Sequence, residues 1–128
     1  MLERNHHLGL LILRLAVGGL MLFHGVAKLE HGIDFIEEAV GPLAYGVYLG
    51  ELLAPLAIVL GYRTRLAALV FGINCVAAVA IAHSTDILKL NEYGGYALEL
   101  LALYLVGALA LFFTGGGALA VSKNSRWD

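Results

Sequence analysis

Four long apolar runs, separated by short polar segments, occupy most of this chain. They cover approximately residues 8–28, 43–60, 66–83 and 96–114. Each run is close to the roughly 20 residues that a helix needs to cross a bilayer. A segment in lipid must be helical, because lipid offers the backbone no hydrogen-bond partners. The sequence therefore predicts an all-α integral membrane protein, a four-helix bundle that forms a single domain over residues 1–128.

The composition favours a membrane domain and argues against several other classes. Hydrophobic residues make up 60% of the chain and charged residues 14%, against roughly 45–50% and about 25% in soluble domains. The net charge of −2, with no basic patch in the sequence, argues against a nucleic-acid partner. Cys75 is the single cysteine, so the chain has no Cys-x-x-Cys redox pair. In the middle of an apolar run, this thiol is expected to be a packing residue.

Basic residues divide unequally between the two sides that four spans would create. One side holds both termini and the link at 61–65, and the other holds residues 29–41 and 84–95. The first side has five basic residues and the second two, namely Arg4, Arg63, Arg65, Lys123 and Arg126 against Lys28 and Lys89. Because loops rich in Lys and Arg stay in the cytoplasm, we expect a multi-pass protein of the cell inner (cytoplasmic) membrane with cytoplasmic N and C termini. The first run is longer than the roughly 7–15 apolar residues of a signal-peptide core, so we expect it to be retained.

Two segments outside the runs are expected to have a definite structure. The acidic segment 29–41 also contains apolar residues, and it is predicted to include a short amphipathic element at the membrane interface; these residues are Ile33, Phe35, Ile36 and Val40. The glycines at 115–117 lack the Lys and Ser/Thr of a phosphate-binding loop. We interpret them as the end of the fourth helix.

Three charged residues, Arg14, Glu51 and Glu99, lie inside three different runs. An ion in hydrocarbon is costly, so such residues tend to be rare, paired and functional. Arg14 and Lys28 share one helical stripe with small residues that let a neighbouring helix approach closely. Pro55 has no N–H, so the carbonyl of Glu51 loses its usual partner, and we expect the second span to bend there.

Counting residues from the ends of the runs predicts where these side chains meet. Glu51 and Glu99 lie about one to two turns below the outer surface, and Arg14 is expected to reach Glu51 from beneath. The sequence thus predicts a polar site in the outer half of the bundle. Its candidate catalytic residues are Glu51 and Glu99, and its candidate ligand-binding residues are Arg14, His24, Lys28, His83, Tyr48 and Tyr96.

Each candidate group has more than one interpretation. Arg14 and Glu51 form either a structural ion pair or a site for an anion, a quinone carbonyl or a proton, and the two roles are compatible. Glu99, away from the obvious cation, is a candidate for relaying protons. His24 and His83 could ligate a metal or a haem from facing helices. We favour hydrogen bonding to a headgroup or a quinone instead, and predict no metal site.

The order and spacing of several motifs resemble the DoxX-like family of small four-span membrane proteins. The resemblance covers nearly the whole chain and is carried by Arg14, Gly18, Phe23-His24-Gly25, Lys28-Leu29, Glu51-Leu52-Leu53-Ala54-Pro55, Gly61-Tyr62-Arg63-Thr64-Arg65 and Glu99-Leu100-Leu101. Some relatives resemble the membrane subunit of thiosulfate:quinone oxidoreductase, and others are linked with oxidative-stress defence and partner redox enzymes. The resemblance therefore implies a redox connection. One departure is the C-terminus, where relatives tend to have Ser-x-Asp after the glycines and this chain reads Gly-Gly-Gly-Ala-Leu-Ala-Val-Ser-Lys-Asn.

These observations lead to three hypotheses about function. The first is a quinone-interacting subunit of a redox complex, in which a partner redox protein supplies the electrons because the chain has no cluster motif. The second is a non-enzymatic membrane scaffold that recruits a partner enzyme through its acidic outer loop and the face of Gly46 and Gly50. The third is a small proton-coupled transporter or channel subunit, which four short spans would form as a homo-oligomer.

Overall fold

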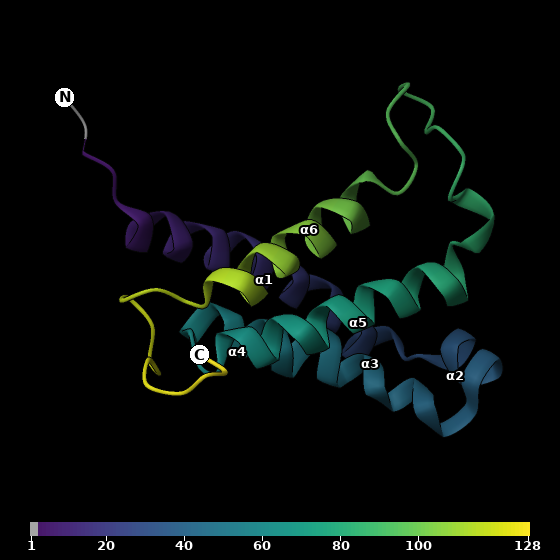
Figure 1. The fold of residues 1–128 in the computed structure, drawn as a ribbon. Helices are drawn as coiled ribbons and strands as arrows, with labels where there is room; N and C mark the ends of the chain where they lie inside the picture. Colours follow the sequence, from purple (N-terminus) through teal and green to yellow (C-terminus); the bar gives the residue numbers. More distant parts are fainter. Residues whose placement is uncertain (1–2) are drawn as a thin grey trace.

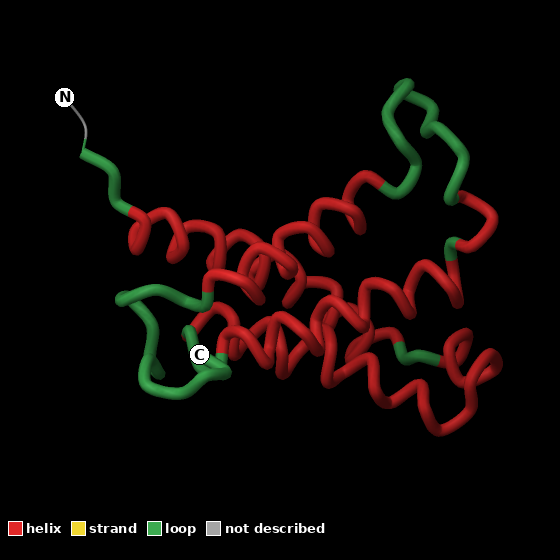
Figure 2. Tube along the Cα trace, in the orientation of Figure 1, coloured by secondary structure: helices red, strands yellow, loops and turns green. Residues whose placement is uncertain are grey.

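The computed structural model describes residues 3–128, and helices dominate that range (Figures 1 and 2). Within it, the only extended pairing is an isolated bridge between Leu90 and Tyr96. The helical elements are α1 (His6–His31), α2 (Asp34–Val40), a 3-10 turn (Gly41–Tyr45), α3 (Gly46–Tyr48), a π-helical turn (Leu49–Leu53), α4 (Ala54–Leu60), α5 (Thr64–Ala82), a second 3-10 turn (Ser84–Asp86) and α6 (Glu99–Thr114). The all-α prediction is confirmed.

Three of the predicted spans are long and apolar enough to cross a membrane. These are α1, the continuous helical stretch Asp34–Leu60, and α5. The fourth, α6, is apolar but has 16 residues, or about 24 Å at 1.5 Å per residue. It begins three residues later than the sequence predicted, because Tyr96 and Ala97 are held by the preceding loop. The Tyr96 hydroxyl donates to the carbonyl of Ile87 at 2.5 Å, and the Ala97 amide donates to Lys89.

The two ends of the bundle carry different segments. The start of α1, the link between α4 and α5, and the segment after α6 lie together at what we call the tail end (Figure 1). The connections at 32–45 and 83–98 are both at the opposite end, which we call the loop end (Figure 1). This is the arrangement that four alternating helices require. Placing the tail end in the cytoplasm remains a prediction from the distribution of basic residues.

Helix α1 and the Asp34–Leu60 stretch pack closely through glycines on the stripe that the sequence predicts. A Cβ added to Gly18 would lie 2.6 Å from the carbonyl oxygen of Pro55. A Cβ on Gly25 would overlap the carbonyl oxygen of Glu51 and lie 2.7 Å from Leu52 Cδ2. Neither glycine can gain a side chain without moving the neighbouring backbone, so these positions fix the register of the two helices.

A π-helical turn occupies the place where Pro55 was expected to distort the second span. The turn covers Leu49–Leu53, and the amide of Ala54 donates to the carbonyl of Leu49, five residues earlier. Pro55 has no N–H to donate to the carbonyl of Glu51. The π-helical turn accommodates this loss, because its hydrogen bonds span five residues in place of four. Such single-turn bulges occur frequently at functional sites.

Replacing Gly25 with alanine should lower the free energy of unfolding by about 2 kcal/mol, the cost of overpacking a close contact. The matched control is Gly19→Ala in the same helix, because a Cβ at Gly19 meets nothing within 4 Å. That change should be neutral or slightly stabilising, since alanine favours helix more than glycine. SDS titration of the purified protein followed by circular dichroism measures both. Equal stabilities for the two variants would contradict the close approach.

The connections at both ends agree with two further predictions. Helix α2 buries Ile36, its N-cap residue Ile33 is buried too, and Phe35 is 55% exposed, as expected of an amphipathic segment at an interface. Helix α6 ends at Thr114, and Gly115 has a φ of 75°, which confirms the glycines as a helix stop. Cys75 is buried in the core of the bundle.

Candidate functional site

The charged centre of the bundle is an ion pair between Lys28 and Glu51. Lys28 Nζ lies 2.6 Å from Glu51 Oε1, and the exposed fractions of the side chains are 23% and 6%. Lys28 comes from the last turns of α1, and Glu51 comes from the middle of the π-helical turn. The Tyr48 hydroxyl lies 3.4 Å from the carbonyl oxygen of Lys28 and ties the two elements together.

The expected contact between Arg14 and Glu51 is wrong. The two helices run antiparallel, with Gly25 opposite Glu51, and this register puts Arg14 beside Gly61. Gly61 follows Glu51 by ten residues, or roughly 15 Å of helix. Lys28, which lies 14 positions after Arg14 on the same stripe, is therefore the partner of Glu51.

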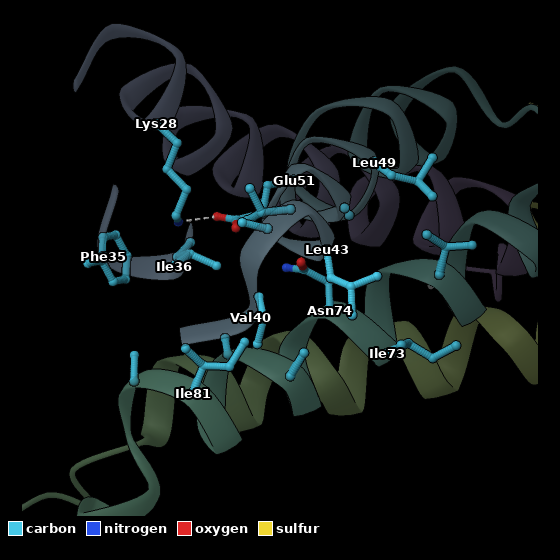
Figure 3. Close-up of a pocket in the computed structure, with 18 of the residues that line it drawn as sticks. Lys28, Phe35, Ile36, Val40, Leu43, Leu49, Glu51, Ile73, Asn74 and Ile81 are labelled. Atoms are coloured by element: carbon cyan, nitrogen blue, oxygen red, sulfur yellow. Dashed lines mark hydrogen bonds and ion pairs between the residues drawn. The ribbon is translucent and has the colours of Figure 1, made fainter. Parts of the chain in front are cut away.

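Two cavities meet at this ion pair. The larger has a volume of about 440 Å³ and lies between residues 35–51 and α5. Its walls are mostly apolar, with Phe35, Ile36 and Val40 on one side and Ile73 and Ile81 on the other (Figure 3). The smaller, about 310 Å³, lies among α1, α5 and α6 and includes Met21, Leu98, Leu101 and Tyr104 in its walls.

The residues common to both cavities form the wall between them. They are Lys28, Glu51, Asn74, Ala78 and His83. Four of these five side chains are polar, whereas the rest of the larger cavity is almost entirely apolar. Figure 3 shows the Lys28–Glu51 contact and the nearby amide of Asn74 at the end of the larger cavity. A ligand that has an apolar body and a polar head fits this distribution of groups.

The structure brings together only part of the predicted site. Lys28, Glu51 and His83 line both cavities, and His24 lines the smaller one. Glu99 lines neither cavity; it is exposed in the first turn of α6, with its carboxylate beside Gly95. The three remaining predicted residues, Arg14, Tyr48 and Tyr96, also lie outside the cavity walls.

Two residues that sequence reasoning did not assign to the site belong to its walls. Asn74 packs against Gly50, where an added Cβ would lie 2.6 Å from Asn74 Oδ1. Tyr104 is buried and meets His24 edge to face, with ring centroids 6.0 Å apart. An amide in the middle of an apolar run is itself a signal. Regular helical spacing, however, places Asn74 on a different face of the third run from Gly72 and His83.

The chemistry that these walls offer is hydrogen bonding and proton exchange. Lys28 and Asn74 supply donors, and Glu51 and His83 can accept or release a proton. In the part of the chain that the structure describes, no three His, Cys, Asp or Glu side chains gather to hold a metal ion. His24 and His83 both line the smaller cavity, from α1 and from the end of α5.

Arg14 forms a separate buried centre at the tail end. It is completely buried, and Nη2 donates to the carbonyl of Leu119 at 2.6 Å. Its Nε and Nη1 atoms have no partner among residues 3–128. Arg14 therefore anchors the segment after α6 to the bundle, and it forms no ion pair with a carboxylate in the described part of the chain.

Comparisons with known proteins identify the family. Comparisons with curated proteins and with solved structures gave no match. The DoxX family model matches residues 9–84, which is more than half of the chain and includes the Lys28–Glu51 pair, Asn74 and His83. The protein therefore belongs to the DoxX family of membrane proteins.

Proposed function

We propose that this DoxX protein is a quinone-interacting subunit of a redox complex in the cytoplasmic membrane, with both termini in the cytoplasm. The observation that carries the proposal is the partly buried Lys28–Glu51 pair at the junction of an apolar cavity and a more polar one. Buried charges in a membrane domain mark functional sites and are paired with one another. A quinone has a polar ring and an apolar tail, and this site offers a place for each.

The residues of the shared wall would each have a definite role. The ammonium of Lys28 and the amide of Asn74 would donate to the carbonyl oxygens of the ring. Glu51 holds Lys28 at the wall, and Glu51 and His83 would exchange protons with the bound ring. The apolar tail would lie along Phe35, Ile36 and their neighbours in the larger cavity.

The electrons would come from a partner protein. The chain has one cysteine, which is buried. Cysteine clusters are the usual protein ligands of iron–sulfur centres, so a redox enzyme docked on the bundle would supply this chemistry. The quinone site would then connect that enzyme to the membrane pool.

Recruitment of a partner enzyme without quinone chemistry is a second candidate function. It is favoured by the loop at 83–98, which projects from the loop end (Figure 1) and leaves Leu88 97% and Tyr93 88% exposed. The Gly46 and Gly50 face suits this role less well than the sequence suggested, since Gly50 packs against Asn74 inside the bundle.

Replacing Glu51 with glutamine should weaken quinone binding tenfold or more. The neutral amide no longer holds the ammonium of Lys28 by charge, and hydrogen bonds to charged groups contribute roughly 1.5–3 kcal/mol, or about tenfold in affinity for each 1.4 kcal/mol. Equilibrium dialysis of decylubiquinone against detergent-solubilised protein measures the change. Glu99→Gln is the matched control and should change the affinity less than twofold.

Three outcomes of this experiment would count against the proposal. If the wild-type protein binds no decylubiquinone, the quinone proposal is rejected. If a partner protein still co-purifies in that case, the result favours recruitment. Equal weakening by Glu51→Gln and Glu99→Gln places the quinone outside the two cavities. Unchanged affinity in the Glu51 variant removes the ion pair from the site.

A further inference from the structure

Folding gathers the basic residues that the sequence keeps apart. Apart from buried Arg14, the tail end has five lysines and arginines, whereas the loop end has Lys28 and Lys89. Four of the five come from the α4–α5 link, the first turn of α5 and the segment after α6: Arg63, Arg65, Lys123 and Arg126. The sequence has no basic patch, so this concentration of positive charge is a property of the fold.

A third cavity, of about 480 Å³, opens among these residues. Its wall includes His7, Arg65, Lys123, Arg126 and the backbone of the glycines at 115–117. Gly115 and Gly117 have φ values of 75° and 80°, a conformation that glycine adopts without strain. Gly115 and Gly116 are buried, and the Gly116 amide donates to the backbone oxygen of Asp128 at 3.0 Å, so the free donors of this cavity are on its side chains.

Positive charge prevails in this cavity. Asp128 has the single acidic side chain among the residues that line the cavity. That side chain is already engaged by Ser122 Oγ at 2.5 Å, by the Ser125 amide at 2.7 Å and by Arg63 at 3.5 Å. The hydrogen bond from Ser122 is the main cause that lowers the pKa of Asp128.

The cations on the cavity wall have donors to spare. Lys123 and Arg126 are exposed and form no ion pair with any residue of the described range 3–128. Arg65 binds two carbonyls, those of Phe112 and Arg126, each at 2.7 Å. An incoming anion would therefore meet free cationic donors on the lysine and arginine side chains.

The same cavity borders an apolar surface. Phe113, in the last turn of α6, lines the cavity and is 76% exposed. Arg126 lies over the ring of Trp127, with Cζ 5.6 Å from the ring centroid. Aromatic rings beside basic residues at the end of a membrane helix are typical of the headgroup level of a bilayer. An occupant of this cavity would thus have its anionic group among the cations and its apolar part along Phe113.

We propose that this cavity binds the phosphate of an anionic phospholipid, with Lys123, Arg126 and Arg65 as the cationic contacts and with an acyl chain beside Phe113. A lipid explains the combination of free cations and exposed apolar surface, whereas a soluble phosphate would use only the cations. Anionic lipids are concentrated in the cytoplasmic leaflet, which is the side predicted for the tail end. This site is independent of the quinone site at the loop end.

Trp127 is the single tryptophan of the chain and provides the readout. The protein is reconstituted into phosphatidylcholine nanodiscs that contain a small, equal fraction of either dibrominated phosphatidylglycerol or dibrominated phosphatidylcholine. Bromine on an acyl chain quenches a nearby indole, so lipid that is enriched at the site quenches more. We expect stronger quenching by the glycerol lipid, with a preference that falls in high salt.

Lys123→Gln should reduce this preference roughly fivefold, since one basic residue near a surface contributes about 1 kcal/mol of attraction to anionic lipid. Lys89→Gln at the loop end removes the same charge far from Trp127 and should leave the preference unchanged. Equal quenching by the two brominated lipids would overturn the proposal, as would equal loss in the two variants. A response of Trp127 emission to inorganic phosphate in detergent, without any lipid preference, would assign the cavity to a soluble anion and also overturn it.

Discussion

Replacing Lys28 with methionine is expected to lower the free energy of unfolding by about 3–5 kcal/mol, the cost of removing one partner of a buried ion pair. Methionine preserves most of the volume and leaves Glu51, 6% exposed, without its cation. Removing Glu51 instead should cost less, because Lys28 is 23% exposed near the end of α1 and its long side chain can turn toward water. SDS titration monitored by circular dichroism measures the difference.

The double variant Lys28→Met with Glu51→Leu separates charge from packing. A buried ion pair contributes little net stability compared with apolar residues of similar volume, so this variant should recover most of the wild-type stability while losing quinone binding. If the double variant were as unstable as Lys28→Met alone, the cost would come from packing, and the stranded charge would not be its cause.

Replacing Ala120 with aspartate should raise the free energy of unfolding by about 3 kcal/mol, the upper range for hydrogen bonds to a charged group. Arg14 is fully buried and has two nitrogens without partners. A Cβ built on Gly61 would touch Arg14 Nη1 and lie 2.5 Å from Ala120 Cβ, so position 120 is within reach of the guanidinium.

A double-mutant cycle with Arg14→Met tests this pairing. In the methionine background, Ala120→Asp should destabilise the protein, because it adds a carboxylate with no cation beside it. The neutral control Ala120→Asn should stabilise the wild-type background less than aspartate does. An additive cycle, with the same effect of aspartate in both backgrounds, would show that the two side chains do not meet.

The sequence predicted the helices well because lipid allows few alternatives for an apolar run. The glycine stripe at Gly18 and Gly25 was also correct, since small residues at helical spacing indicate a close neighbour. What the stripe could not supply was the register of that neighbour. Arg14 and Lys28 lie on the same face, and either could meet Glu51 until the antiparallel alignment is known.

The wall residues show a second limit of sequence reasoning. Glu99 was chosen because it is a carboxylate inside an apolar run, but the run includes a turn, and Glu99 starts the helix instead of lying within it. Asn74 was passed over because regular helical spacing assigned it to another face. Its partner is Gly50, whose position depends on the π-helical turn, and the spacing of regular helices does not include such a turn.

The π-helical turn lets the parts of the second spanning helix before and after it present different faces to their neighbours. An α-helix rotates by about 100° per residue, so one residue more or less in the turn would swing everything above it around the axis. The lower part, Ala54–Leu60, is fixed against α1 by Gly18, while above it Gly50 faces α5 and Glu51 faces α1. The π-helical turn thereby sets the direction in which the Glu51 carboxylate points around the helix axis. A relative without this turn would need its carboxylate at a neighbouring sequence position to line the same cavities.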